Sequence, residues 1–517
     1  MKNKIMTMLA LVALVLCVAC DDDKGNYDYH QLNEPEITGV PESLSVLIHD
    51  RFNLDPSLGG NITDLDAYSY EWKAINNSGD MDETVLGNSK HLDSEITLDA
   101  GKYTLYFTAT DKKTGLFWRE SLELTVSDPS SEGWLVLCDV DGKTRLDVIS
   151  AVTGQTYLDI LKNNGMDSLS RPYSVQYQPN CGYSDSPFYL FTADGATRLS
   201  KNNFAWQKDY AFRYEVAKQA NLKPRGMVCE QNGFSRVLVS GGKAYYAQNM
   251  GIQGLFGSPA NKGFDVAPYV GVNVGAMSYV SIYLLYDVTN KRFVTYCPLI
   301  TALGFSGTVF SMDDMEQVAV NMKGSDMVTG TAFDAYPTGL DFVYMENTKY
   351  DPGNAKMGVT YTLLRDGDKT KLYGIQLGDL LTFMDCTFAL GKAYYGDLSD
   401  CKDISRATCF AFSSLRNYMY YAVGGTVYRV DLSELPLRSS KQFTLSGENI
   451  TMMKFNLYQN SASVHDYDLI VASERDGNGT LRIYDGMATE GDFSKVSPTV
   501  HKGFAKIVDV TYRERTN

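Results

Sequence analysis

The chain has 517 residues, of which 44% are hydrophobic and 21% are charged, as in a folded protein with a large core. Its formal net charge of −15 argues against nucleic acid or another polyanion as a partner. The 35 tyrosines and 44 glycines, against 15 prolines, are typical of many short strands joined by tight turns.

The N-terminus predicts export from the cell. Two lysines precede an apolar run at residues 6–18, which is too short to span a bilayer comfortably. The run ends at Ala19-Cys20 and resembles the lipobox of bacterial lipoproteins, although Cys17 stands where that motif usually carries leucine. The resemblance implies that residues 1–19 are a signal peptide and that Cys20 carries the lipid anchor.

An acidic run, Asp21-Asp22-Asp23-Lys24, follows the cysteine. It resembles the signal that sends lipoproteins of Bacteroidota to the outer face of the outer membrane. By itself such a run is also typical of a solvated tether, and residues 20–35 are predicted to be a flexible lead-in. We therefore expect a lipid-anchored protein of the outer membrane that faces the cell exterior.

Residues 36–127 are predicted to form a small β-sandwich. Residues 68–73 alternate in polarity, with Trp72 as the expected core anchor. Residues 101–111 alternate strictly, which places four apolar side chains on one face of a strand: Tyr103, Leu105, Phe107 and Ala109. A polar linker at residues 128–132 marks the expected domain boundary.

Residues 133–517 predict a β-propeller, which makes the whole chain all-β. Strand and hairpin units recur with a turn pair in each: Asp141-Gly142, Asp194-Gly195, Gly241-Gly242, Thr289-Asn290, Asp366-Gly367, Gly424-Gly425 and Asp476-Gly477. They indicate seven blades, with six or eight left open because residues 298–339 can hide strands. The lone last strand, residues 504–513, is expected to pair with the first hairpin and close the ring.

The cysteines predict no disulfide framework and no zinc site, because seven remain after Cys17 and Cys20 and they have no short repeating spacing. Cys138 and Cys409 lie in apolar strands and are expected to be small buried hydrophobic residues. Whether Cys386 and Cys401 pair is left open.

Three motifs carry a resemblance to a known family: Asp23-Lys-Gly-Asn-Tyr-Asp-Tyr29, the Tyr70–Trp72 segment, and Gly133–Leu137. On these residues the chain resembles the PKD-like lipoproteins of Bacteroidota along essentially its whole length. The resemblance implies an accessory role beside transporter pairs of the SusC/SusD type. It supplies no catalytic residues.

No catalytic motif, cofactor motif or metal-ligand spacing stands out in the sequence. Residues 139–147 approach a calcium loop, but Lys143 and Gly142 stand at the wrong positions and a turn fits better. We therefore expect neither catalytic residues nor a cofactor or metal site.

Aromatic residues between the hairpins are the candidate ligand-binding residues. Residues 204–217 predict a helix on which Trp206, Tyr210 and Tyr214 share one face, where they either bind a ligand or pack on a blade. A Gly- and Pro-containing loop at residues 250–270 is expected to rim a central pocket with three aromatic side chains: Phe256, Phe264 and Tyr269.

The predicted function is that of a cell-surface lipoprotein which binds an oligomeric nutrient, glycan or peptide, or docks on a SusC/SusD-type TonB-dependent transporter. A surface hydrolase or lyase that uses a propeller pocket, and a scaffold of the transporter without its own ligand, are the alternatives.

Overall fold

A computed structural model describes residues 34–515. The gaps are residues 49, 61, 78–81, 163, 182, 202, 231–232, 234, 250–253, 275–281, 299–308, 313–331, 351–357, 381–387, 458–463 and 488–489. The chain divides into two compact units, Met1–Ser127 and Asp128–Asn517. No helix in the described part of the chain is long and apolar enough to cross a membrane.

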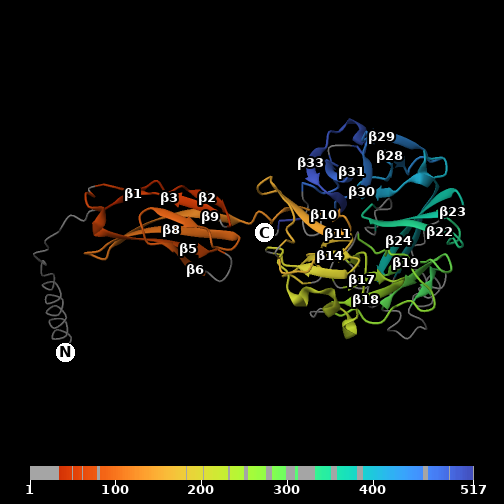
Figure 1. Cartoon of the computed structure of the whole chain (residues 1–517), viewed down its shortest axis with the longest axis horizontal. Helices are drawn as coiled ribbons and strands as arrows, with labels where there is room; N and C mark the ends of the chain where they lie inside the picture. Colours follow the sequence, from red (N-terminus) through yellow and green to blue (C-terminus); the bar gives the residue numbers. More distant parts are fainter. Residues whose placement is uncertain are drawn as a thin grey trace, which may run out of the picture. The chain divides into compact units, whose positions relative to one another are not determined.

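In its described residues, the first unit is a β-sandwich of nine strands (Figure 1). They are β1 Glu36–Thr38, β2 Ser43–Leu47, β3 Arg51–Leu54, β4 Ser57–Gly59, β5 Tyr68–Asn76, β6 Glu83–Gly87, β7 Leu92–Glu95, β8 Gly101–Asp111 and β9 Phe117–Ser127. Five of these strands form one sheet in the order β2-β9-β8-β5-β6, and two strand pairs, β1-β4 and β3-β7, complete the unit.

The alternating pattern of β8 predicted this core correctly. Tyr103, Leu105, Phe107 and Ala109 are all buried. Trp72 is fully buried on β5, with its ring centre 4.7 Å from that of Phe107. The Trp72 Nε1–H donates to the carbonyl of Ser89 at 3.0 Å, so this large side chain is buried without losing its hydrogen bond.

The second unit is a seven-bladed β-propeller in the described residues. Blade 1 contains β34 Lys506–Arg513, β10 Gly133–Val140, β11 Lys143–Ser150 and β12 Thr156–Tyr157. Blade 2 contains β13 Pro172–Tyr177, β14 Phe188–Thr192 and β15 Gly195–Leu199; blade 3 contains β16 Met227–Cys229, β17 Ser235–Ser240 and β18 Lys243–Gln248. Blade 4 contains β19 Tyr283–Asp287, β20 Arg292–Tyr296 and β21 Phe310–Ser311; blade 5 contains β22 Asp341–Thr348, β23 Val359–Asp366, β24 Lys369–Leu380 and β25 Phe388–Asp397. Blade 6 contains β26 Cys409–Phe412, β27 Tyr418–Val423, β28 Thr426–Asp431 and β29 Ser439–Thr444; blade 7 contains β30 Asn449–Phe455, β31 Leu469–Arg475, β32 Asn478–Tyr484 and β33 Thr499–Phe504.

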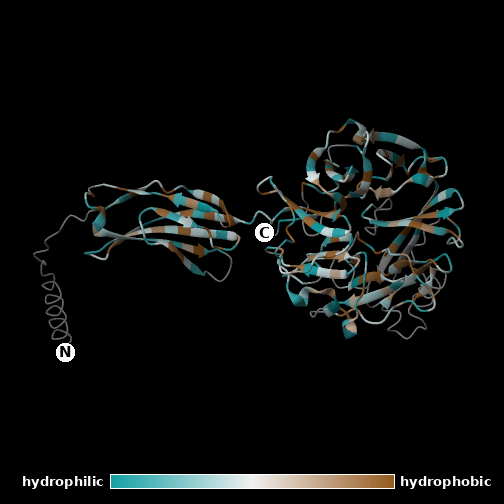
Figure 2. Ribbon diagram, in the orientation of Figure 1, coloured by the Kyte–Doolittle hydropathy of each residue, from teal (hydrophilic) through white to brown (hydrophobic). Residues whose placement is uncertain are grey.

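The blades follow one another in chain order around a ring (Figure 1). Their strands mix hydrophobic and hydrophilic residues, as Figure 2 shows, because each sheet buries its faces against neighbouring blades while its turns meet solvent. The predicted turns are confirmed: in the first hairpin Asp141 and Gly142 both have positive φ, of 52° and 82°.

The last strand closes the ring, as predicted. β34 pairs antiparallel with β10, so that Trp134 lies opposite Tyr512 and Val136 lies opposite Val510. The Trp134 and Tyr512 ring centres are 4.7 Å apart. Residues nearly 380 positions apart thus form one sheet, which removes an open sheet edge.

The predicted helix at residues 204–217 is wrong. The segment forms short 3₁₀ turns instead, at Lys208–Tyr210 and Phe212–Glu215. They are interrupted because Ala211 and Val216 are extended and form bridges with Thr197 and Phe256. Pairing with neighbouring strands therefore overrides the helical spacing of the aromatic residues.

One disulfide joins neighbouring blades, between Cys181 after β13 and Cys229 in β16. The prediction that the cysteines form no disulfide framework missed this pair. Of the remaining described cysteines, Cys138 and Cys401 are buried and free, whereas Cys409 is half-buried. Cys386 lies outside the described residues.

Candidate functional site

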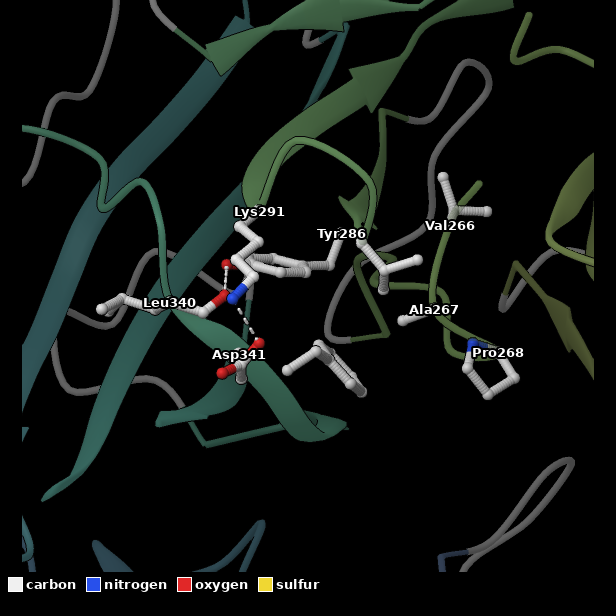
Figure 3. Close-up of a pocket in the computed structure, with 9 residues that line it drawn as sticks. Val266, Ala267, Pro268, Tyr286, Lys291, Leu340 and Asp341 are labelled. Carbon is white, nitrogen blue, oxygen red and sulfur yellow. Dashed lines mark hydrogen bonds and ion pairs between the residues drawn. The ribbon is translucent and has the colours of Figure 1, made fainter. Parts of the chain in front are cut away.

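A pocket of about 290 Å³ lies between blades 4 and 5 (Figure 3). Three segments form it: residues 266–268 leading into blade 4, the β19–β20 hairpin, and the beginning of β22. In Figure 3, Lys291 and Asp341 face one another on one side of the pocket, and Val266, Ala267 and Pro268 stand on the other. The site therefore exists only once two blades have packed together.

The polar groups of the pocket are already bonded. The Tyr286 hydroxyl donates to the carbonyl of Leu340 at 2.6 Å, and burial raises the pKa of this phenol so that it stays a donor. The Lys291 Nζ lies 2.7 Å from the Asp341 Oδ1 in a salt bridge at the rim. The rest of the lining is apolar or aromatic, including Val288 and Phe342.

The loop at residues 250–270 is predicted to rim a central pocket with aromatic side chains. To the pocket between blades 4 and 5 it contributes Val266, Ala267 and Pro268 instead. Tyr269 is not among the lining residues, and its ring packs against that of Phe342 with ring centres 5.5 Å apart. Hydrophobic periodicity did not indicate this pocket, because its other walls come from strands that lie far along the sequence.

Phe264 and Phe256 do not line the pocket. Phe264 is half-buried and packs against the core between blades 3 and 4. The prediction for Phe256 is wrong: its side chain is fully buried, with the Arg236 guanidinium 5.0 Å from its ring centre, and has no surface for a ligand.

Trp206 and Tyr210 belong to the packing of blade 2. The Trp206 Nε1–H donates to Thr197 Oγ1 at 2.9 Å, and its half-buried ring packs on the core between blades 1 and 2. Tyr210 is buried, and its hydroxyl donates to Asp185 Oδ2 at 3.2 Å. The structure thus places them by the packing alternative. Cys20 lies outside the described residues, and its lipidation stays a prediction.

Charged side chains gather on the inner strands, which surround the propeller axis. Lys454 on β30 forms a 2.6 Å salt bridge with Asp509 on β34, and Asp509 also accepts the backbone N–H of Val175 on β13 at 3.0 Å. These bonds join blades 7, 1 and 2. The sequence did not indicate them, since the three residues lie on separate strands.

Glu346 on β22 belongs to the same inner surface. Its carboxylate accepts the Tyr344 hydroxyl at 2.8 Å and the backbone N–H of Phe412 at 3.2 Å, which joins blades 5 and 6. Burial raises the pKa of the Glu346 carboxyl to about 7, although these two hydrogen bonds and the charge of Lys454 act in the opposite direction. A carboxyl with such a pKa can exchange a proton near neutral pH.

Within the described residues, no group of three or more His, Cys, Asp or Glu side chains is arranged to hold a metal ion. The Asp139–Asp147 segment is a hairpin, in which the Gly142 N–H donates to Asp139 Oδ1 at 2.7 Å. Asp147 is buried against Arg145, with 2.7 Å between its Oδ2 and the Arg145 Nη2. The turn interpretation of this acidic segment fits these contacts.

The family match among the comparisons with known proteins concerns mainly the first unit. Residues 20–172 match the PKD-like family. This part of the chain is PKD-like. The match covers the sandwich and the β10–β12 strands of blade 1, whereas the predicted resemblance extends over the whole chain. No curated protein matches the chain.

Solved structures similar to the chain include a quinonprotein alcohol dehydrogenase-like protein from Bacteroides thetaiotaomicron. It is 13% identical, with 93% of this chain and 99% of that chain covered and a TM-score of 0.42. A functionally unknown protein from Desulfotomaculum acetoxidans is 8% identical, with 74% and 98% covered and a TM-score of 0.38. The WD40 domain of SCAP from fission yeast is 9% identical, with 64% and 74% covered and a TM-score of 0.33. These scores are low, and the propeller assignment depends on the strand pairing within this chain.

Proposed function

We propose that the protein is a lipid-anchored binding protein of the outer cell surface, which captures an oligomeric nutrient, docks on a SusC/SusD-type transporter, or does both. The observation that carries binding is the pocket between blades 4 and 5. Its tyrosine, lysine and aspartate are bonded to the protein itself, so the lining offers shape and apolar surface to a ligand.

Two observations support export. The Cys181–Cys229 disulfide is typical of oxidising compartments outside the cytosol. The PKD-like match begins at Cys20, the residue at which the lipobox places the anchor. The SusC/SusD association rests on the resemblance alone.

The first experiment is a pull-down of the full chain, carrying a C-terminal tag, from detergent-solubilised outer membranes. Mass spectrometry then identifies co-purifying proteins and small oligomers. Recovery of a TonB-dependent transporter or of a nutrient oligomer supports the proposal, and recovery of neither contradicts it. Recovery of the transporter without any oligomer favours the scaffold alternative. In the same strain, Cys20→Ala is expected to release the protein from the membrane fraction.

A surface hydrolase or lyase is the second candidate, and Glu346 is the residue that favours it. A carboxyl with a pKa of about 7 is suited to general acid–base catalysis at neutral pH, and Lys454 supplies a neighbouring positive charge. Turnover of a glycan or peptide substrate that is lost in Glu346→Gln, with ligand binding retained, would promote this candidate.

A further inference from the structure

The chemistry of the pocket lining limits what can occupy it. A sugar ring carries several hydroxyl groups, and burying a hydroxyl without a hydrogen-bond partner is unfavourable. The Tyr286 hydroxyl is engaged by Leu340, and the Lys291 ammonium is engaged by Asp341. The interior therefore favours an occupant whose buried part is apolar.

The size of the pocket limits the occupant further. Its volume of about 290 Å³ lies just below the usual range for small-molecule sites, about 300–1,000 Å³. Such a space holds one bulky side chain rather than several units of an oligomer. The rings of Phe342 and Tyr286 have centres 5.5 Å apart. They supply an aromatic surface that suits an apolar side chain.

The rim provides groups of both signs. The side chains of Lys291 and Asp341 are 42% and 66% exposed, so each keeps hydrogen-bonding capacity toward solvent. An extended peptide presents an N–H and a C=O beside every side chain. The Lys291 ammonium can donate to such a C=O, and the Asp341 carboxylate can accept such an N–H.

We propose that the pocket between blades 4 and 5 binds one bulky apolar side chain, such as phenylalanine or leucine, of an extended nutrient peptide, with Lys291 and Asp341 contacting the backbone beside it. This inference rests on the proposed nutrient-binding function and names its ligand class. It decides between the two kinds of oligomer in favour of peptides.

The pocket mouth offers a substitution with a matched control. Val288 lines the pocket and is 40% exposed, so Val288→Glu places a charge at the mouth without burying it in the core. Val500 on β33 of blade 7 is 43% exposed, so Val500→Glu makes the same change on another blade. Pro268→Asp, at an exposed position in the 266–268 segment of the lining, is the second pocket variant.

The test measures binding of end-blocked peptides to the full chain by isothermal titration calorimetry. A Gly-Gly-Phe-Gly-Gly peptide is expected to bind, and a peptide with glutamine in place of phenylalanine is expected to bind about tenfold more weakly or not at all. Val288→Glu and Pro268→Asp are each expected to weaken binding of the phenylalanine peptide at least about tenfold, whereas Val500→Glu leaves it unchanged. Thermal unfolding of each variant reports whether it is folded.

Several outcomes would overturn the inference. They are no binding of the phenylalanine peptide, equal binding of the glutamine peptide, undiminished binding by both folded pocket variants, or a glycan whose binding is lost in Val288→Glu. If the pull-down recovers a glycan while the peptides fail, the nutrient-binding function stands and the peptide inference falls. If it recovers only the transporter while the peptides fail, only docking on the transporter stands and the peptide inference falls. If the pull-down recovers neither and the peptides also fail, both fall.

Discussion

The interface between blades 2 and 3 and that between blades 5 and 6 each contain a glutamate, Glu215 buried and Glu346 half-buried, and the two are stabilised in different ways. Glu215 lies between two arginines, with its Oε1 2.8 Å from Arg198 Nε and its Oε2 2.6 Å from Arg236 Nη1. Glu346 has only a tyrosine hydroxyl and a backbone N–H at hydrogen-bonding distance among its described contacts.

The difference shows that the propeller accommodates a glutamate between two blades in two forms. Between blades 2 and 3, the carboxylate of Glu215 pairs with two buried arginines, Arg198 and Arg236. Between blades 5 and 6, the pKa rises to about 7, so the neutral acid becomes accessible near physiological pH. The first interface thus depends on an ion-paired cluster, and the second is expected to respond to pH.

The largest expected effect is from Glu215→Gln. The substitution leaves the Arg198 and Arg236 charges buried without their carboxylate, and we expect the free energy of unfolding to fall by about 3–5 kcal/mol. Urea unfolding of the full chain measures it. A loss no larger than that of an exposed ion pair would show that the buried cluster contributes little.

Removing the disulfide between blades 2 and 3 is expected to come next. The bond closes a loop with a sequence separation of 48, for which the chain-entropy relation predicts a stabilisation of about 4 kcal/mol. We expect Cys181→Ser combined with Cys229→Ser to lower the free energy of unfolding by about 2–4 kcal/mol. In wild type a reductant should have the same effect, and unchanged unfolding in reductant would contradict the prediction.

Glu346→Gln tests the pH response of the other interface. The folded-state pKa of about 7 lies above the ordinary value, so this group's contribution to stability is fully present below about pH 4.5. It is lost as the pH rises through 7, and the free energy of unfolding falls by about 1–3 kcal/mol across that window. Glutamine still accepts the Tyr344 hydroxyl but does not ionise, so the variant should lack this decline and be the more stable protein at pH 8. Identical pH profiles for variant and wild type would refute the assignment.

Asp400→Asn should have the smallest effect. The Asp400 Oδ2 lies 2.7 Å from Arg438 Nη1, yet both side chains are well exposed, at 70% and 60%. Solvent screens such a pair, and we expect a loss of at most about 1 kcal/mol by urea unfolding. A loss comparable with that of Glu215→Gln would remove the distinction between buried and exposed charges in this propeller.

The elements that sequence predicted well depend on local patterns. The alternation along residues 101–111 defined the buried face of β8, because side chains of a strand point alternately to its two sides. Turn pairs such as Asp141-Gly142 located the hairpins, because few residues adopt positive φ without strain. The same patterns failed at residues 204–217, where aromatic spacing suggested a helix and strand pairing prevented it.

The sequence by itself determined the all-β architecture, the recurring hairpins and the closing of the ring by its last strand. Tertiary structure alone decided that Cys181 pairs with Cys229, that Glu215 lies between two arginines, and that a pocket opens between blades 4 and 5. Each of these features joins residues from different blades or from distant segments. Periodicity and turn chemistry describe how one strand or hairpin folds, whereas contacts between blades depend on how whole sheets pack around the ring.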